Sequence, residues 1–228
     1  HNLTNIYLQK IKEIGNYAFY NCAIRRLVLP DSIQSIGDYA FKYCESLNSI
    51  KIPNSVANIG KKAFGNCNSL TSITIPSSVT SIGDYAFEGC VSLTTIVIPD
   101  SVTDIGDYVF KDCESLTSII IPSSVTSIGD YVFKDCESLT SIVIPDSVTG
   151  ISEGLFSKCS SLASVIIPSG VARIEDYAFF ECENLASINI PQSITSIGDF
   201  AFWGCKSLYP IIIPETIMHI GDCAFYGC

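Results

Sequence analysis

The chain has few of the residues from which most catalytic sites are built. Only two of its 228 residues are histidine, His1 and His219. A Ser–His–acid site needs its partners within hydrogen-bond range of one another, and His219 takes a position that serine mostly holds elsewhere in the chain, with no fixed nucleophile beside it. We therefore expect that the protein is not an enzyme.

Basic residues are also scarce. Lys and Arg number 13 against 23 Asp and Glu, which gives a net charge of −10 and a pI of about 4.5. Nucleic-acid binders need clustered cations to displace the counterions of the phosphates, so this balance excludes nucleic acid and anionic lipid as partners. We interpret the acidity as a means of keeping a repetitive apolar chain in solution.

Long apolar runs are missing as well, although 47% of the residues are hydrophobic and the mean hydropathy is +0.36. A membrane-spanning helix needs about 18 consecutive apolar residues. The longest runs here are short, such as Ile119 to Ile121 before Pro122. The sequence therefore predicts no membrane insertion and a large core distributed along the chain.

What the chain does have is a repeat of 23 residues. Proline, cysteine and phenylalanine each recur with this period, and the leucine or isoleucine that opens each unit marks about ten units, the first of them shorter. The openers are Leu3, Ile24, Leu47, Leu70, Leu93, Leu116, Leu139, Leu162, Leu185 and Leu208. A fixed period of this length is the signature of a solenoid, in which stacked units bury a continuous core.

One unit, such as residues 70–92, reads as a strand, an irregular segment and a short helical turn. Ile73 and Ile75 share one face at the strand period of two. Pro76 lacks an N–H donor and so suits the end of the strand. Asp84 is expected to cap the helical turn by accepting backbone N–H bonds. Stacked units would then form a parallel sheet with one strand from each unit.

The motif L-x-x-I-x-I, followed by I-P-x-S-V-T-S-I-G-D-Y-A-F-x-x-C, closely resembles the BspA-like leucine-rich repeats over essentially the whole chain. The resemblance implies an α/β repeat solenoid, a right-handed leucine-rich-repeat superhelix with one parallel β-strand and a short helical turn per repeat. Residues 1–228 would form a single domain. The last unit stops at Cys228 without a capping repeat, so we expect a fragment of a longer protein. Ser152 and Glu175 at the glycine position, and Gly154 at the tyrosine position, predict irregular curvature there.

The same resemblance implies a cell-surface or secreted protein that takes part in adhesion. Its partner would be a host matrix protein or a cell-surface protein, and no cofactor or metal is expected. The alternative is a structural spacer that holds another domain away from the surface and has no ligand of its own. The near-identity of residues 100–122 and 123–145 favours the spacer, whereas the clustering of unusual residues from Ser152 onward favours a binding site.

The eleven cysteines suggest neither zinc nor disulfides. The columnar cysteines lie about 23 residues apart, far from the two-to-four-residue spacing of paired zinc ligands. Parallel side chains in a stack also match disulfide geometry poorly, so we expect buried free thiols that fill the core. Cys223 takes the outer tyrosine position. It is either a reactive exposed thiol or a surface substitution without consequence.

An acidic residue also recurs once per unit, where the helical turn is expected to begin. Capping accounts for this column, and a bound cation is the alternative; like charges about 5 Å apart should keep the column hydrated. The column comprises Asp84, Asp107, Asp130, Glu153, Asp176, Asp199 and Asp222.

Two surfaces are candidate binding sites. The first is on the predicted concave face of the sheet, where β-branched apolar residues lie beside a hydroxyl column. The apolar residues are Val97, Ile120, Val143, Ile166 and Ile212, and the hydroxyl residues are Thr95, Ser118, Ser141 and Ser164. A contiguous apolar patch of this kind marks partner sites, although the β-propensity of a sheet accounts for the same residues.

The second candidate surface is an aromatic stripe of Phe180, Trp203 and Tyr226, which follow the core phenylalanine in successive units. In other units the same position holds non-aromatic residues, such as Lys42, Glu88 and Lys111. Aromatic residues dominate interface energetics, so the stripe could anchor a partner. Packing against further units is the alternative.

Overall fold

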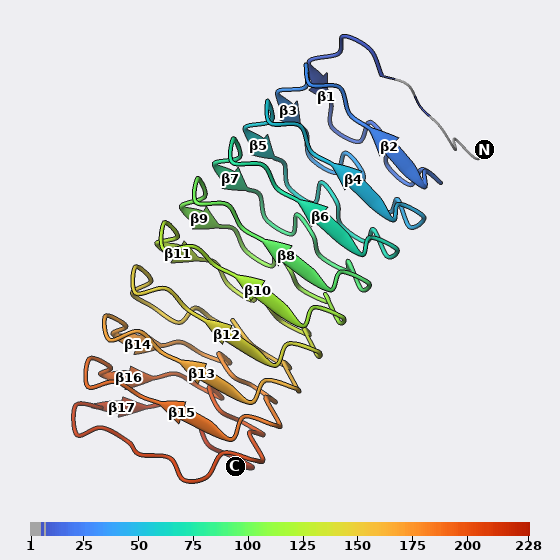
Figure 1. The fold of residues 1–228 in the computed structure, drawn as a ribbon. Helices are drawn as coiled ribbons and strands as arrows, with labels where there is room; N and C mark the ends of the chain where they lie inside the picture. Colours follow the sequence, from blue (N-terminus) through green and yellow to red (C-terminus); the bar gives the residue numbers. More distant parts are fainter. Residues whose placement is uncertain (1–5, 7) are drawn as a thin grey trace.

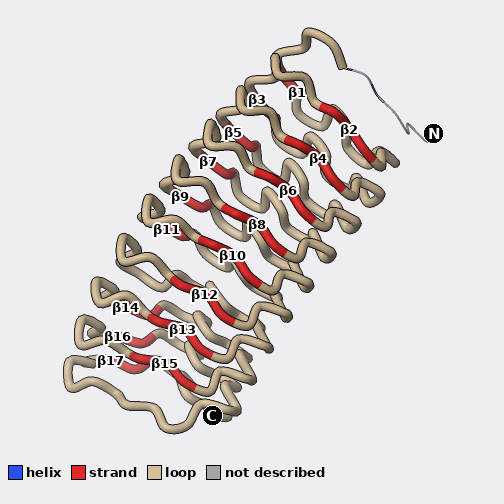
Figure 2. Tube along the Cα trace, in the orientation of Figure 1, coloured by secondary structure: helices blue, strands red, loops and turns tan. Residues whose placement is uncertain are grey.

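A computed structural model describes residue 6 and residues 8–228. The repeat winds into a parallel β-solenoid of about nine coils, with β1 (Glu13–Ile14) near one end of the stack and β17 (His219–Ile220) near the other (Figure 1). Most coils contribute one long strand of three residues and one short strand of two residues, and turns connect them (Figure 2). The first unit opener, Leu3, lies outside the described residues.

The long strands form one side of the coils and the short strands form another. The long strands are β2 (Arg26–Val28), β4 (Ser49–Lys51), β6 (Ser72–Thr74), β8 (Thr95–Val97), β10 (Ser118–Ile120), β12 (Ser141–Val143), β13 (Ser164–Ile166) and β15 (Ser187–Asn189). The short strands are β1 (Glu13–Ile14), β3 (Ser35–Ile36), β5 (Asn58–Ile59), β7 (Ser81–Ile82), β9 (Asp104–Ile105), β11 (Ser127–Ile128), β14 (Arg173–Ile174), β16 (Ser196–Ile197) and β17 (His219–Ile220). Equivalent positions of neighbouring units pair in register, as Ser72 does with Thr95.

The predicted helical turn is wrong, because the described part of the chain contains no helix. Two residues per unit take the left-handed conformation, for example Tyr85 (φ 58°) and Gly89 (φ 69°). Around them the backbone makes consecutive β-turns: the N–H of Ala86 donates to the carbonyl of Gly83 at 3.2 Å, and the N–H of Glu88 donates to the carbonyl of Tyr85 at 3.0 Å. Alternate N–H groups donate to the next coil instead, as Tyr85 does to Asp107 at 2.8 Å. The tyrosine position thus ends each turn at a positive φ that an α-helix cannot contain.

The core is built from the columns that the repeat predicts. The phenylalanine rings stack along the axis with centroids 5.1–5.8 Å apart, from Phe19 to Phe225. The rings from Phe41 to Phe202 are fully buried. Each coil therefore supplies one layer of a continuous core, which no single unit could bury.

The cysteine column confirms the predicted buried free thiols in eight coils. Cys22 is half-buried and Cys228 is exposed. The thiols also act as donors: Cys90 Sγ–H donates to the carbonyl of Phe64 at 3.2 Å, and the same bond recurs from coil to coil. Burial raises the pKa of the Cys90 thiol from 9.0 to about 12, so these groups stay protonated. The column is hence a ladder of weak hydrogen bonds as well as a packing element.

Both sheets are interrupted between the same two coils. The long-strand sheet ends at β10 and begins again at β12 (Figure 1). The short-strand sheet ends at β11, and the following coil makes only a single bridge, from Ile151 to Ile174. The irregularity lies beside Ser152 and Glu175, where the sequence departs from the repeat.

Candidate protein-binding surfaces

The long-strand face presents the apolar residues that the sequence indicates. The strands bury their central residue and expose the residues on either side. Val97, Ile120, Val143 and Ile166 are 59–69% exposed. Strand pairing places Ile120 beside Val97 and Ile166 beside Val143. These four residues form what we call the apolar stripe.

Ile212 does not continue the apolar stripe. Ile166 pairs with Asn189, so a polar residue lies between Ile166 and the last coil. The segment around Ile212 is not a strand. Pro210 stands there at the position that serine takes in β13 and β15, and it has no N–H to donate to a parallel ladder.

The hydroxyl column lies beside the apolar stripe. Thr95 pairs with Ser118, and Ser141 pairs with Ser164, so the four hydroxyl groups follow the stripe in register. From β6 to β15, the outward positions of the described long strands carry no charged side chain. The face can therefore offer apolar contact and neutral hydrogen bonds to a ligand.

A groove of about 610 Å³ opens where the last coil leaves the sheet. It lies beside β13 and β15, and its lining includes Ile166, Ile188 and Ile212. Sequence reasoning did not predict this groove. The signal was available in Pro210, which falls outside the 23-residue period of the other nine prolines and precludes strand pairing.

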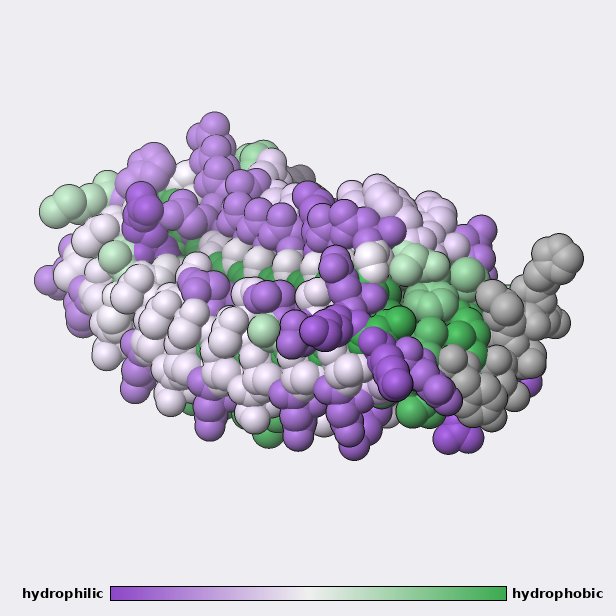
Figure 3. Space-filling view, turned by 90° about the horizontal axis from the view of Figure 1, so that it is seen from above, coloured by the Kyte–Doolittle hydropathy of each residue, from purple (hydrophilic) through white to green (hydrophobic). Residues whose placement is uncertain are grey.

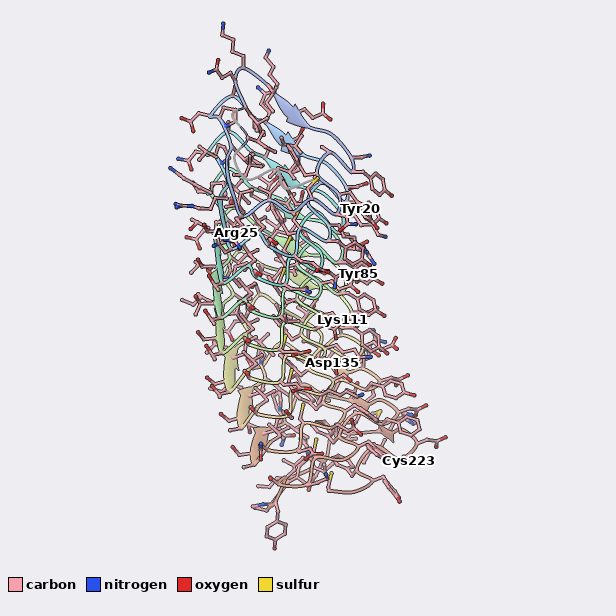
Figure 4. The ribbon with its side chains drawn as sticks, turned by 90° about the vertical axis from the view of Figure 1, so that its right-hand side faces the viewer. Tyr20, Arg25, Tyr85, Lys111, Asp135 and Cys223 are labelled. Atoms are coloured by element: carbon pink, nitrogen blue, oxygen red, sulfur yellow. The ribbon has the colours of Figure 1, made fainter. Side chains whose placement is uncertain are left out.

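The aromatic stripe lies on another side of the molecule. Figure 4 shows Tyr20 and Lys111, which occupy the same column as the stripe, on the side away from the long strands, whereas Arg25 lies with the strands. The ring centroids of Phe180 and Trp203 are 4.8 Å apart, and those of Trp203 and Tyr226 are 5.8 Å apart. The three rings form one stack, so the structure brings the predicted residues together.

A second aromatic cluster was not predicted from the sequence. Tyr17 stacks on Tyr39 at 4.7 Å, Tyr20 meets the edge of Tyr43 at 5.6 Å, and the Lys42 ammonium lies 4.7 Å from the centroid of Tyr43. Tyr20 occupies the same outer column as Phe180, Trp203 and Tyr226, which is the signal that could have revealed the cluster. The aromatic residues of that column lie toward the two ends of the solenoid.

The acidic column does not cap helices, and that prediction is corrected. Five of its aspartates, from Asp84 to Asp199, instead accept a hydrogen bond from the backbone N–H of the same column in the next coil. The N–H of Asp130 donates to Asp107 Oδ1 at 2.9 Å, and the N–H of Asp222 donates to Asp199 Oδ1 at 2.7 Å. Burial, followed by repulsion from Asp107, raises the pKa of Asp130. Among the described residues, no group of three or more His, Cys, Asp or Glu side chains is arranged to hold a metal ion. The column joins neighbouring coils.

Cys223 is exposed at the tyrosine position, on the side away from the long strands (Figure 4). Like the tyrosines, it has a positive φ, of 53°. A reactive thiol and a surface substitution without consequence both stay open as interpretations of this residue.

The outer surface is largely hydrophilic along the side seen from above, and hydrophobic residues gather toward the N-terminal end (Figure 3). Ile6, Leu8 and Ile11 are partly buried against the core there. No helix in the described residues combines the length and the apolar character needed to cross a bilayer.

The chain resembles known proteins along its full length. The model of the BspA type leucine-rich repeat region matches residues 1–117 and 103–228. A leucine-rich repeat protein from Eubacterium ventriosum is 30% identical with a TM-score of 0.76, and the alignment covers 99% of this chain. This chain spans 65% of the length of that relative. A comparison with curated proteins found no match.

Two further solved structures are similar. The leucine-rich repeat protein of T. pallidum is 31% identical with a TM-score of 0.63, over 86% of this chain and 82% of that one. A leucine-rich cell surface protein of Faecalibacterium prausnitzii is 30% identical with a TM-score of 0.59, over 100% of this chain and 80% of that one. The repeat motif, the solenoid and these matches agree, and the chain belongs to the family of BspA type leucine-rich repeat proteins.

Proposed function

We propose that the chain is a non-catalytic protein-binding module of a cell-surface or secreted protein, and that its long-strand face binds the partner. The observation that carries this proposal is the apolar stripe of Val97, Ile120, Val143 and Ile166 on a face without charge from β6 to β15. The similarity to the cell surface protein of F. prausnitzii supports the location. Adhesion to a host matrix or cell-surface protein is the role that fits best.

The size of the stripe indicates what kind of contact it can make. Each exposed Val or Ile can bury on the order of 100 Å², so the stripe offers roughly 400 Å² of apolar surface. That is the size of a functional patch on a soluble protein, and about half of the roughly 800 Å² that each partner buries in a standard interface. The neighbouring hydroxyl column would supply the polar rim of the contact.

A pull-down from host matrix and cell-surface extracts tests this proposal. The test variant carries Val97→Ser, Ile120→Ser, Val143→Ser and Ile166→Ser together. Val28→Ser is the matched control, because Val28 occupies the same column and is 79% exposed but lies apart from the stripe. We expect wild type and control to capture a protein that the folded test variant binds at least about 100-fold more weakly, which corresponds to about 3 kcal/mol.

The aromatic stripe is a second candidate surface, because Tyr226 is 64% exposed at the end of its stack. Trp203→Ala in the same pull-down tests it. If this variant alone fails to capture the partner, the aromatic stripe is the binding site and the apolar stripe is not. The spacer is the competing function, and the near-identity of residues 100–122 and 123–145 favours it. Failure of a well-folded wild-type chain to capture any protein would support the spacer.

A further inference from the structure

The coils of this solenoid stack closely only because glycine recurs at one position. A Cβ placed on Gly106 would lie 2.7 Å from Asp84 Oδ1 and 3.0 Å from Asp84 N, and one on Gly83 would lie 2.8 Å from Lys61 N. Atoms this close must move apart. Ser152 and Glu175 stand at the same position and do carry a Cβ. The N–H of Glu175 still donates to the carbonyl of Ile151 at 2.9 Å, as in the regular coils. The coil of Ser152 is therefore the one that does not approach its predecessor as the others do.

The hydrogen bonds show what changes at Ser152. In regular coils the glycine N–H donates to an isoleucine carbonyl of the preceding coil, as Gly129 does to Ile105 at 2.9 Å. At the irregular coil, the hydroxyl of Ser152 donates to the carbonyl of Ile128. A side-chain hydroxyl thus occupies the place of a backbone donor at the interruption of the short-strand sheet.

The long-strand sheet is interrupted between the same coils. Next to the long strands, a series of backbone bonds runs from Thr94 to Thr71 at 3.3 Å and from Thr117 to Thr94 at 3.0 Å, and it resumes from Ala163 to Thr140 at 3.0 Å. The series therefore has a gap between Thr117 and Thr140. This gap coincides with the end of the long-strand sheet at β10 and its new start at β12. Both sheets therefore lose their ladder between one pair of coils.

The turn side between the same coils keeps its bonds. Three backbone hydrogen bonds of 2.8–3.0 Å still join the coils there, from Tyr131 to Glu153, from Phe133 to Leu155 and from Asp135 to Ser157. The two coils thus lack ladder bonds on two faces and keep them on the third. Such an arrangement can bend like a hinge, with the bonded side as its axis.

Side-chain packing is irregular in the adjoining coil as well. The ring of Tyr131 occupies the space above Gly154, and its hydroxyl donates to Glu153 Oε1 at 2.6 Å. The rings of Phe156 and Phe179 are inclined by 22°, whereas other neighbouring core phenylalanines are inclined by at most 8°. A hollow of about 350 Å³ opens beside these coils, between residues 150–153 and residues 175–176.

The geometry points to a hinge between the coil of β10 and β11 and the coil of β12, which divides the solenoid into two blocks. The hinge lies across the middle of the apolar stripe, because Val97 and Ile120 belong to one block and Val143 and Ile166 belong to the other. Bending would change the spacing of Ile120 and Val143 and so adjust the face to its ligand. This last consequence rests on the proposed function, whereas the hinge itself does not.

Hydrogen–deuterium exchange of the full chain, without any partner, tests the hinge. Among residues 118–128 and 140–151, we expect the backbone amides that lose a ladder bond at the break to exchange at least about tenfold faster than their counterparts in β6 and β8. Amides that keep a bond to another neighbour, such as Thr126 to Thr103 at 2.8 Å, should stay protected. The amides of residues 131–135 should exchange as slowly as their counterparts in regular coils. Uniform protection from β4 to β13 would overturn the inference.

A variant that restores the repeat gives the second test. Ser152→Gly should slow exchange in residues 118–128 and 140–151 to the level of β6 and β8. Ser160→Gly is the matched control, since it makes the same substitution in the same coil away from the glycine position, and it should leave these rates unchanged. Unchanged exchange in the restoring variant would refute the assignment of the hinge to the Ser152 side chain. Neither test depends on a partner, so failure of the proposed function would leave both results standing.

Discussion

The cysteine column makes the stability of the solenoid sensitive to alkaline pH. Burial raises the pKa of the interior thiols above the ordinary value of 9.0, to about 12 in the case of Cys90. An unfolded chain releases its thiol protons above pH 9, whereas the folded chain retains them. The free energy of unfolding must therefore fall as the pH rises from 9 toward 12.

The structure sets the size of this effect. Eight thiols, from Cys44 to Cys205, are completely buried and have raised pKa values. Each loses about 1 kcal/mol of stabilisation between pH 9 and 10, because the thiol of the unfolded chain is already half ionised at pH 9. Together they would lower the free energy of unfolding by about 8 kcal/mol between pH 9 and 10, which is comparable with the whole stability of many domains.

Urea unfolding followed by circular dichroism, in the presence of a reductant, measures this slope between pH 7 and 10. We expect a stability plateau below pH 8.5 and a steep fall above pH 9. The double variant Cys113→Ala and Cys136→Ala should reduce the slope by about a quarter, because two of the eight buried thiols are removed. A free energy of unfolding that is unchanged between pH 9 and 10 would refute the reasoning.

Three further predictions concern single residues. Gly106→Ala should lower the free energy of unfolding by roughly 1–3 kcal/mol through overpacking between coils, as urea unfolding would show. An unchanged urea midpoint would contradict the close approach of the coils at Gly106. Asp107→Ala should cost about 1–3 kcal/mol, because the N–H of Asp130 loses its acceptor, whereas Asp107→Asn should retain most of the stability in the same assay. Trp203→Ala should lower stability by at least about 1 kcal/mol by removing its stacking on both neighbours, and thermal unfolding would detect this loss.

The core can be predicted from the repeat because residues at the same position of each unit are buried to the same extent in successive coils. Phe87, Cys90 and Ile73 face the interior as their spacing indicates. The register also follows, because identical units can stack in parallel with equivalent positions side by side.

The helical turn could not be excluded from residue preferences alone. Tyrosine rarely takes a positive φ, yet Tyr85, Tyr108 and Tyr131 all do so. Their rings stack on one another at 4.6–5.1 Å, and their N–H groups bond to the next coil. Contacts between coils thus outweigh the local preference, and they exist only once the coils are stacked. The same reason explains why the short strands, such as β7, were expected as irregular segments.

Of the candidate sites, the two stripes could be predicted from the sequence, whereas the groove and the interrupted sheets could not. The apolar stripe follows from the period of two in the strands, and the aromatic stripe follows from the period of 23. The groove beside β15 depends on how the last coil diverges after Pro210, and the interrupted sheets depend on distances between glycines of neighbouring coils. Sequence reasoning placed the irregularity at Ser152 and Glu175 but could not show that both sheets end there.

Site-specific photo-crosslinking tests most directly whether the long-strand face binds the partner. A photoreactive phenylalanine analogue would replace Ile120 in one variant, Val28 in a second and Tyr226 in a third, since all three side chains are more than half exposed. Each variant would be irradiated with the partner captured in the pull-down. Our account predicts a strong crosslink from position 120 and little from positions 28 and 226, whereas a crosslink from position 226 alone would contradict it.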